Sequence, residues 1–394
     1  MNLKKVVLAL VAAVTVTGGL FAQEKIFVYR DIKKMKEEFK KDGKKFEEVI
    51  QSAQKGNVES QLKLGLINFI EDNQEANIAS YTWFQRAAKQ GNLTALYWVA
   101  FCHDCGKGVK QDIKEAMKLY EEAAKKGCTQ AMMELGHIYF NGRAGKIDFD
   151  KAFKLFREAA DKGNTSGMQM VGLCYKIGAG VKQEEKEYQK WLMKAVERKD
   201  DTAMFLLGEL HIGNNKKEEA FQWYKKSAEL GNEFAAYELS RCYYRGIGVK
   251  KDEKTGIKWL MKAAECDIPE ALFMIGINYF DGIDLKKDEV KGEEYIKRAA
   301  DLGLVNAIVE LGNIYADKNK LNECVALYQK AVELGSAEAM HNLSGHYFFG
   351  MGVKSDYEKG MKLLLKSAEL GYEPAVKKLQ EMEKLMKEQE NKKK

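Results

Sequence analysis

Two cysteines three residues apart, Cys102 and Cys105, have the spacing of a redox dithiol or of half a zinc site. They fall at the end of an expected helix, immediately before Gly106. Reactive thiols of this spacing use a helix N-terminus, which stabilises thiolate, so a helix C-terminus disfavours that chemistry. The sequence has no second Cys-x-x-Cys to complete a zinc site. We therefore expect these cysteines to be structural.

Three further patterns in the sequence have residue types that could carry chemistry. Glu134 and His137 lie three residues apart, on one face of an expected helix, but no other ligand is close to them in sequence. The glycine-rich turns lack the Gly-Lys-Ser/Thr ending of a phosphate loop and follow a helix, not a strand. No Ser-x-x-Lys stands at a turn-to-helix position. The sequence thus predicts no catalytic residue, no metal site, no cofactor and no enzymatic activity.

The chain repeats itself, and the repeat decides where these residues lie. Glycine ends a recurring Ala-Ala-x-x-Gly string, at spacings of 32 to 36 residues. These marker positions are Gly56, Gly91, Gly127, Gly163, Gly231, Gly303, Gly335 and Gly371, with Lys199 and Asp267 in the same register. A fixed period of this length is the signature of a repeat array. Ten markers delimit nine intervals.

Each interval predicts a first helix after the marker. Positions 4, 5, 8, 9 and 12 form one apolar stripe, with alanine at position 4 and tyrosine at position 12. Position 9 carries a small residue, such as Gly136 or Gly208, which allows a second helix to approach closely. His103 and His211 occupy the tyrosine position and are interpreted as structural substitutes.

A turn and a second helix complete the interval. Four turns read Gly-x-Gly-Val, starting at Gly106, Gly178, Gly246 and Gly350. Their glycines supply positive φ, and an acidic residue such as Asp112 caps the next helix. Four of the five tryptophans lie eight residues before a marker, where we expect core positions: Trp83, Trp191, Trp223 and Trp259. The two 32-residue intervals lack this turn, and we expect both of their helices to remain intact.

This pattern resembles Sel1-like repeats, relatives of tetratricopeptide repeats, over residues 56 to 371. The resemblance implies an all-α fold, an α/α superhelix (solenoid) of about nine helix-turn-helix repeats, used as a scaffold for protein assemblies. A cysteine-rich subset of exported Sel1-like proteins has a regular cysteine pair in each repeat and is credited with penicillin binding or β-lactamase activity. The seven cysteines here are not regularly paired, and Cys102, Cys174 and Cys242 share one repeat position that predicts a buried slot. A cell-wall or β-lactam hydrolase stays the alternative to a scaffold.

The first helix has a second face, formed by positions 3, 7, 10 and 14, which lines the concave side in stacked helical hairpins. We predict that a protein or peptide partner, from the envelope or from a host, binds there. The apolar stretch on this face is either an anchor for that partner or buried against the neighbouring repeat. The predicted partner-binding residues are Trp98, Phe101, Glu134, His137, Met170, Leu173, Glu238, Arg241, Glu310 and Asn313.

The N-terminus reads as an export signal. Lys4 and Lys5 precede an apolar run from Val6 to Val16, which is too short to span a bilayer comfortably, although a membrane anchor is the alternative reading. Leu20-Phe21-Ala22 then forms a plausible cleavage end. We predict a signal peptide at 1–22, a lead segment at 23–45, a solenoid with terminal caps at 46–380 and a charged tail at 381–394. A periplasmic or extracellular location follows, with no membrane span after cleavage. The 64 basic and 58 acidic residues are interspersed, which argues against nucleic-acid binding.

Overall fold

The computed structural model describes residues 32–37, 42–71 and 73–393. The predicted signal peptide lies outside these residues, as does much of the predicted lead segment. Every regular element in the described part of the chain is an α-helix, which confirms the predicted all-α class. The chain divides into two compact units, Met1–Ala203 and Met204–Lys394, here called unit 1 and unit 2.

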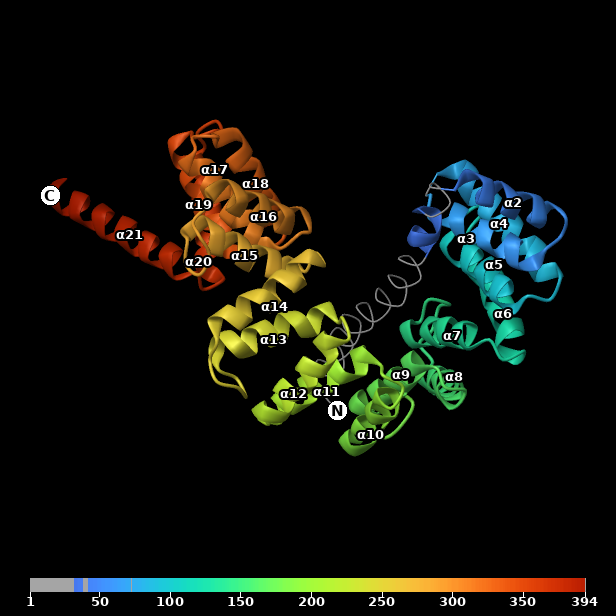
Figure 1. Ribbon diagram of the computed structural model, residues 1–394. Helices are drawn as coiled ribbons and strands as arrows, with labels where there is room; N and C mark the ends of the chain where they lie inside the picture. Colours follow the sequence, from blue (N-terminus) through green and yellow to red (C-terminus); the bar gives the residue numbers. More distant parts are fainter. Residues whose placement is uncertain (1–31, 38–41, 72, 394) are drawn as a thin grey trace. The chain divides into compact units, whose positions relative to one another are not determined.

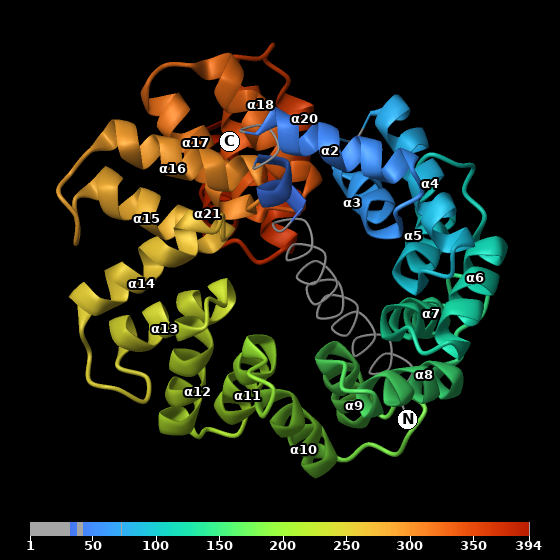
Figure 2. The same cartoon turned by 45° about the vertical axis from the view of Figure 1, so that its right-hand side comes forward.

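Unit 1 alternates first and second helices, and each helix packs against the next one in the chain. The first helices α3, α5, α7 and α9 lie on one side of the unit and the second helices α4, α6, α8 and α10 on the other (Figure 2). The helices are α2 (Gly43–Gln54), α3 (Val58–Phe69), α4 (Gln74–Lys89), α5 (Leu93–Cys105), α6 (Ile113–Lys125), α7 (Thr129–Asn141), α8 (Phe149–Asp161), α9 (Thr165–Ile177) and α10 (Glu185–Val196).

Unit 2 continues the same alternation. Its helices are α11 (Asp201–Gly213), which begins in unit 1, α12 (Lys217–Glu229), α13 (Glu233–Arg245), α14 (Glu253–Glu265), α15 (Pro269–Asp281), α16 (Glu289–Asp301), α17 (Val305–Asp317), α18 (Leu321–Glu333), α19 (Ala337–Phe349), α20 (Tyr357–Glu369) and α21 (Glu373–Lys393). The far end of α21 extends away from α20 (Figure 1). The predicted charged tail from residue 381 continues this helix.

A small residue lets the two helices of a repeat cross closely. A Cβ placed on Gly208 would lie 2.4 Å from Cε1 of Tyr224, and one on Gly65 would lie 2.4 Å from Cε1 of Phe84. The alanine at position 4 is fully buried in α5, α7 and α13, at Ala95, Ala131 and Ala235. These contacts confirm the predicted apolar stripe and the role of the glycine within it.

The marker glycine makes the turn between repeats. Its φ is 104° at Gly231, where an added Cβ would meet nothing within 4 Å, so the glycine serves the backbone conformation and not the packing. Lys199 and Asp267 adopt positive φ in the same register, at 59° and 58°. The asparagine that follows a marker, such as Asn164 or Asn232, caps the next first helix by accepting a backbone N–H.

The Gly-x-Gly-Val turn connects one repeat to the previous one. Both glycines have positive φ, and the second lies against the start of the preceding second helix. A Cβ on Gly108 would lie 2.1 Å from the carbonyl oxygen of Asn77, and one on Gly248 would lie 2.1 Å from that of Lys217. Asp112 caps α6 as predicted, accepting from the backbone N–H of Glu115. The turn glycine is therefore part of the stacking between repeats.

The two short repeats replace this turn with a tight one. Asn215 and Asn319 each take φ of 57° there. The helices on either side, α11 and α12, and α17 and α18, keep 13 residues each. The prediction that the turn shortens and the helices do not is confirmed.

The tryptophans before the markers differ from expectation. Trp191 is buried, but Trp83, Trp223 and Trp259 are only half-buried. In each case a cation three residues later covers the ring, at 4.8 Å for Arg86 over Trp83, 4.5 Å for Lys226 over Trp223 and 4.0 Å for Lys262 over Trp259. The core prediction is wrong for these three, because part of each ring stays exposed to solvent beside a cation of its own helix.

Candidate functional site

The predicted partner-binding residues all lie on first helices, but the structure exposes them unequally. Met170 and Leu173 are 2% and 7% exposed, and Glu134 and His137 are 7% and 6% exposed. The other six are half-buried: Trp98, Phe101, Glu238, Arg241, Glu310 and Asn313. Burial removes Met170 and Leu173 from any surface that a partner could contact. The exposed part of the apolar stretch is thus Trp98 and Phe101 on α5.

Trp98 and Phe101 belong to an aromatic cluster in unit 1. The ring of Trp98 lies 4.9 Å from that of Phe69 on α3 and 5.6 Å from that of Phe101. It also stacks on the buried ring of Phe84 on α4, at 5.5 Å. Tyr97 completes the cluster, with its ring centre 6.2 Å from that of Phe101. One face of Trp98 therefore serves the core, while its remaining surface stays accessible.

Glu134 and His137 are buried and contact side chains of neighbouring helices. The Tyr97 hydroxyl of α5 donates to Oε1 of Glu134 on α7, at 3.4 Å. The His137 ring packs on Phe156 of α8, with centroids 4.9 Å apart. Among the residues that the structure describes, no group of three or more His, Cys, Asp or Glu side chains could hold a metal ion.

Unit 2 presents polar groups at the equivalent positions. Arg241 donates to both carboxylate oxygens of Glu238 on α13, at 2.7 and 2.8 Å. Burial raises the pKa of Glu238 although Arg241 opposes the shift. On α17, Asn313 donates to Oε2 of Glu310 at 3.1 Å and accepts from Asn342 of α19 at 3.2 Å. These positions are therefore hydrogen-bonded on α13 and α17, whereas on α15 between them they carry the partly buried Met274 and Ile277.

A tyrosine seven residues before the marker reaches this side from the second helix. The Tyr224 hydroxyl donates to Oε1 of Glu209 at 2.6 Å, and the Tyr328 hydroxyl donates to Oδ1 of Asn313 at 2.6 Å. Burial and Glu209 raise the pKa of Tyr224, so its hydroxyl stays protonated. The repeat pattern predicted only an apolar side chain at this position. The signal was the use of tyrosine where other repeats have Phe84 or Phe156.

The Cys-x-x-Cys motif is structural in this geometry. Cys102 is fully buried, and burial raises the pKa of its thiol to about 12. Burial also raises the pKa of Cys105. The residue between them, Asp104, is 3% exposed and forms a two-pronged ion pair with Arg143 of the next repeat, 3.1 Å from Oδ2 to Nη1. The motif thus ties two repeats together, and raised pKa values oppose thiolate chemistry.

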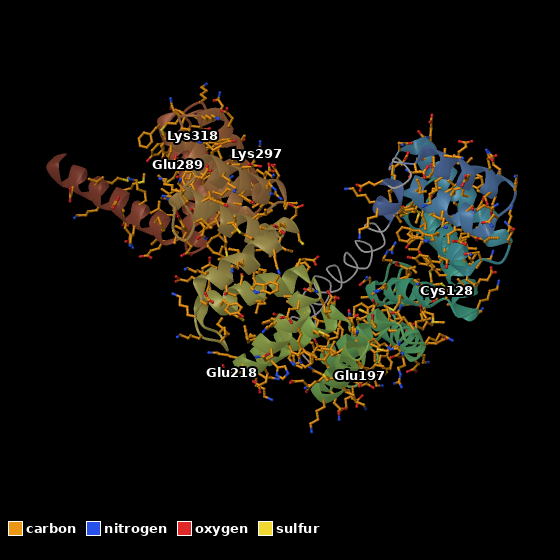
Figure 3. All side chains as sticks on the ribbon, in the orientation of Figure 1. Cys128, Glu197, Glu218, Glu289, Lys297 and Lys318 are labelled. Atoms are coloured by element: carbon orange, nitrogen blue, oxygen red, sulfur yellow. The ribbon has the colours of Figure 1, made fainter. Side chains whose placement is uncertain are left out.

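The remaining sulfur positions follow the repeat. Cys174 and Cys242 share the position of Cys102 and are 0% and 2% exposed, so the predicted buried slot is confirmed. Six free thiols are Cys102, Cys105, Cys128, Cys174, Cys242 and Cys324. Cys128 lies at the turn after α6 (Figure 3). Packing of helices, not a ladder of regular disulfides, accounts for the stack in the described residues.

One tyrosine-position histidine, His103, also connects two repeats. Nε2 of His103 lies 3.0 Å from the Tyr81 hydroxyl of α4, in the preceding repeat. A cavity of about 850 Å³ lies elsewhere in unit 1, among α6, the turn between α7 and α8, and Gly180. It is lined by none of the predicted partner-binding residues.

The repeat geometry corresponds to a known family. The Sel1 repeat model matches nine segments, at residues 58–92, 93–128, 129–164, 165–200, 202–232, 234–268, 269–304, 310–336 and 337–372. Each segment covers all or part of one first helix and one second helix. The chain belongs to the Sel1 repeat family and is a helical repeat scaffold related to tetratricopeptide proteins.

Two solved structures are similar over most of their length. One is c5321, a protective antigen of uropathogenic Escherichia coli strains, with 28% identity, a TM-score of 0.50, and coverage of 84% of this chain and 80% of that one. The other is a Sel1 repeat protein from Oxalobacter formigenes, with 25% identity, a TM-score of 0.54, and coverage of 85% and 89%. No curated protein matches the chain. Within the described residues, no helix is both long enough and apolar enough to cross a bilayer.

Proposed function

We propose that this chain is an exported scaffold that binds a peptide or helical segment of a partner protein on the first-helix side of unit 1. The observation that carries the proposal is the aromatic cluster of Phe69, Tyr97, Trp98 and Phe101, in which Trp98 and Phe101 remain half-exposed. Tryptophan and other large aromatic residues dominate the binding energy of protein interfaces because they desolvate a large rigid area.

The polar residues on the first helices of unit 2 form a hydrogen-bonded surface within that unit. Glu238, Arg241, Glu310 and Asn313 are half-buried and held in place by hydrogen bonds within their own units. Preorganised polar groups lose little conformational entropy when a partner binds. In this proposal the aromatic residues of unit 1 anchor the partner, and the polar residues of unit 2 would provide a hydrogen-bonding surface of their own.

The export part of the proposal is supported by Lys4 and Lys5, by the apolar run from Val6 to Val16 and by a plausible cleavage end at Ala22. The mature protein would be periplasmic or extracellular. Cell fractionation with N-terminal sequencing of the isolated protein tests this. A mature N-terminus close to residue 23 supports export, and an intact Met1 in the cytoplasmic fraction refutes it.

The binding experiment compares two tryptophans of opposite sides. Trp98→Ala with Phe101→Ala removes the proposed anchor, whereas Trp83→Ala removes a half-buried ring from a second helix. Affinity purification from an envelope fraction, followed by quantitative mass spectrometry, should show partners captured by wild type and by Trp83→Ala but lost with the double variant. Equal capture by all three proteins would refute the anchor. Loss of helicity in the double variant would place both rings in the core instead.

A further inference from the structure

The end of each second helix forms a row along the edge of each unit. We call the two residues before each marker the turn edge. In unit 1 the turn edge is Gln54, Lys55, Lys89, Gln90, Lys125, Lys126, Asp161, Lys162, Glu197 and Arg198. In unit 2 it is Glu229, Leu230, Glu265, Cys266, Asp301, Leu302, Glu333, Leu334, Glu369 and Leu370. Glu197 marks the last of these turns in unit 1 (Figure 3).

The leucines of the unit 2 turn edge are open to solvent. Leu230, Leu302, Leu334 and Leu370 are 52%, 51%, 52% and 56% exposed. The same position in unit 1 is also exposed and carries Lys, Gln or Arg in every turn. Unit 1 is thus an internal control, because it shows that the repeat folds with a polar side chain there. Leucine recurs in unit 2 for a reason other than folding, and a regular exposed apolar row indicates a contact surface.

The charges of the two turn edges are opposite. The unit 1 edge carries six cations and two anions, a net charge of +4, and the unit 2 edge carries five carboxylates and no cation. Lys126 already pairs with Glu122 of its own helix at 2.7 Å, but both side chains are about half exposed, so that pair is weak. The opposite charges of the two turn edges are therefore available to a binding partner.

We propose that the turn edge of unit 2 binds the turn edge of unit 1 in a second copy of this chain. Both edges repeat with the same period, so several turns can meet in register. The aliphatic stems of lysines cover the leucines, and their ammonium groups reach the flanking carboxylates. Two unit 2 edges would instead bring carboxylates together, which selects the unlike pair.

The contact joins different surfaces of the two copies and is heterologous. A heterologous contact leaves one free edge on each end, so association proceeds to chains or rings with increasing concentration. The turn edge includes none of the predicted partner-binding residues. Self-association and partner binding are therefore separable by substitution.

Sedimentation velocity of the full mature chain tests the contact directly. Association should increase with protein concentration at about 20 mM salt and disappear at about 500 mM, because salt screens exposed charges. Lys125→Glu with Lys126→Glu should abolish association, and so should Glu333→Lys with Glu369→Lys. A mixture of these two variants should associate again, because the unaltered unit 2 edge of the first variant can bind the unaltered unit 1 edge of the second.

The leucines have a matched control. Leu334→Ser with Leu370→Ser should weaken self-association at least tenfold and leave the melting temperature unchanged. Leu385→Ser, at a residue 58% exposed but outside the turn edge, should alter neither. A wild-type chain that stays monomeric at all concentrations in low salt overturns the proposal. Association that survives either single-edge charge reversal, measured on that variant alone, also overturns it.

Discussion

Equivalent repeat positions carry different chemistry in unit 1 and unit 2. Position 7 of the first helix is Trp98 on α5 but Glu238 on α13, and position 10 is Phe101 but Arg241. The residue immediately before the marker is, for example, Lys126 in unit 1 and Leu334 in unit 2. The helix-crossing glycines, positive-φ markers and turn contacts are the same in both. The fold therefore constrains a small set of repeat positions, and the other positions can differ between repeats according to function.

The largest predicted effect tests whether both units share one stacking contact. Gly108→Ala in unit 1 and Gly248→Ala in unit 2 each place a Cβ 2.1 Å from a backbone oxygen of the previous repeat. We expect each to lower the free energy of unfolding by about 3 kcal/mol, from steric overlap added to the strain of positive φ. Urea denaturation measures this.

Gly231→Ala is the control for those variants, because its added Cβ has no neighbour within 4 Å. It should cost only the strain of positive φ, about 1 kcal/mol. If Gly108→Ala lowers the free energy of unfolding no more than Gly231→Ala does, the Gly-x-Gly-Val turn does not hold the repeats together.

The second prediction concerns a tie specific to unit 1. Asp104→Asn breaks the buried ion pair with Arg143, while position 13 of other first helices carries residues such as Phe140 or Tyr244. We expect a loss of about 2 kcal/mol in unfolding free energy, reduced from the value for a fully buried pair because Arg143 is 41% exposed. Thermal melting of Asp104→Asn beside the exposed Asp301→Asn checks this, and equal melting temperatures would contradict it.

The third prediction separates the units through one repeat position. Tyr224→Phe and Tyr328→Phe remove hydroxyls that donate at 2.6 Å, so each should lower the unfolding free energy by about 1 kcal/mol. Tyr120→Phe in unit 1 should be neutral or stabilising, because its buried hydroxyl has no hydrogen-bond partner in the described structure. A destabilised Tyr120→Phe would show that the two units do not differ here.

The smallest prediction concerns a marker without glycine. Lys199 takes φ of 59°, a conformation that costs an ordinary residue energy. Lys199→Gly should raise the unfolding free energy by about 0.5 kcal/mol, the relief being partly offset by the greater entropy of an unfolded glycine. Lys162→Gly, at a helix end with φ of −82°, should lower it instead. Urea denaturation measures the unfolding free energy of both variants. A change of the same sign in both would contradict the claim that positive φ strains Lys199.

The sequence predicted the fold closely because each repeat specifies its own turns and crossings. Position 9 glycines, markers and capping aspartates act within one repeat or between neighbours, so their periodicity suffices. Exposure on the first-helix side could not be predicted the same way. Helical periodicity assigns Met170 and Trp98 to the same face, but packing of adjacent repeats buries the first and leaves the second half-exposed. The Asp104–Arg143 pair joins residues 39 positions apart and leaves no local pattern.

Site-specific photo-crosslinking tests the central claim, that partners bind on the first-helix side of unit 1. A photoreactive residue at Thr94, exposed on α5 one turn before Trp98, is compared with one at Lys118, exposed on the second helix α6. In cells producing the full chain, we predict a discrete adduct with a partner protein from position 94 and none from position 118. Adducts of equal yield from both positions, or from position 118 alone, would contradict the account.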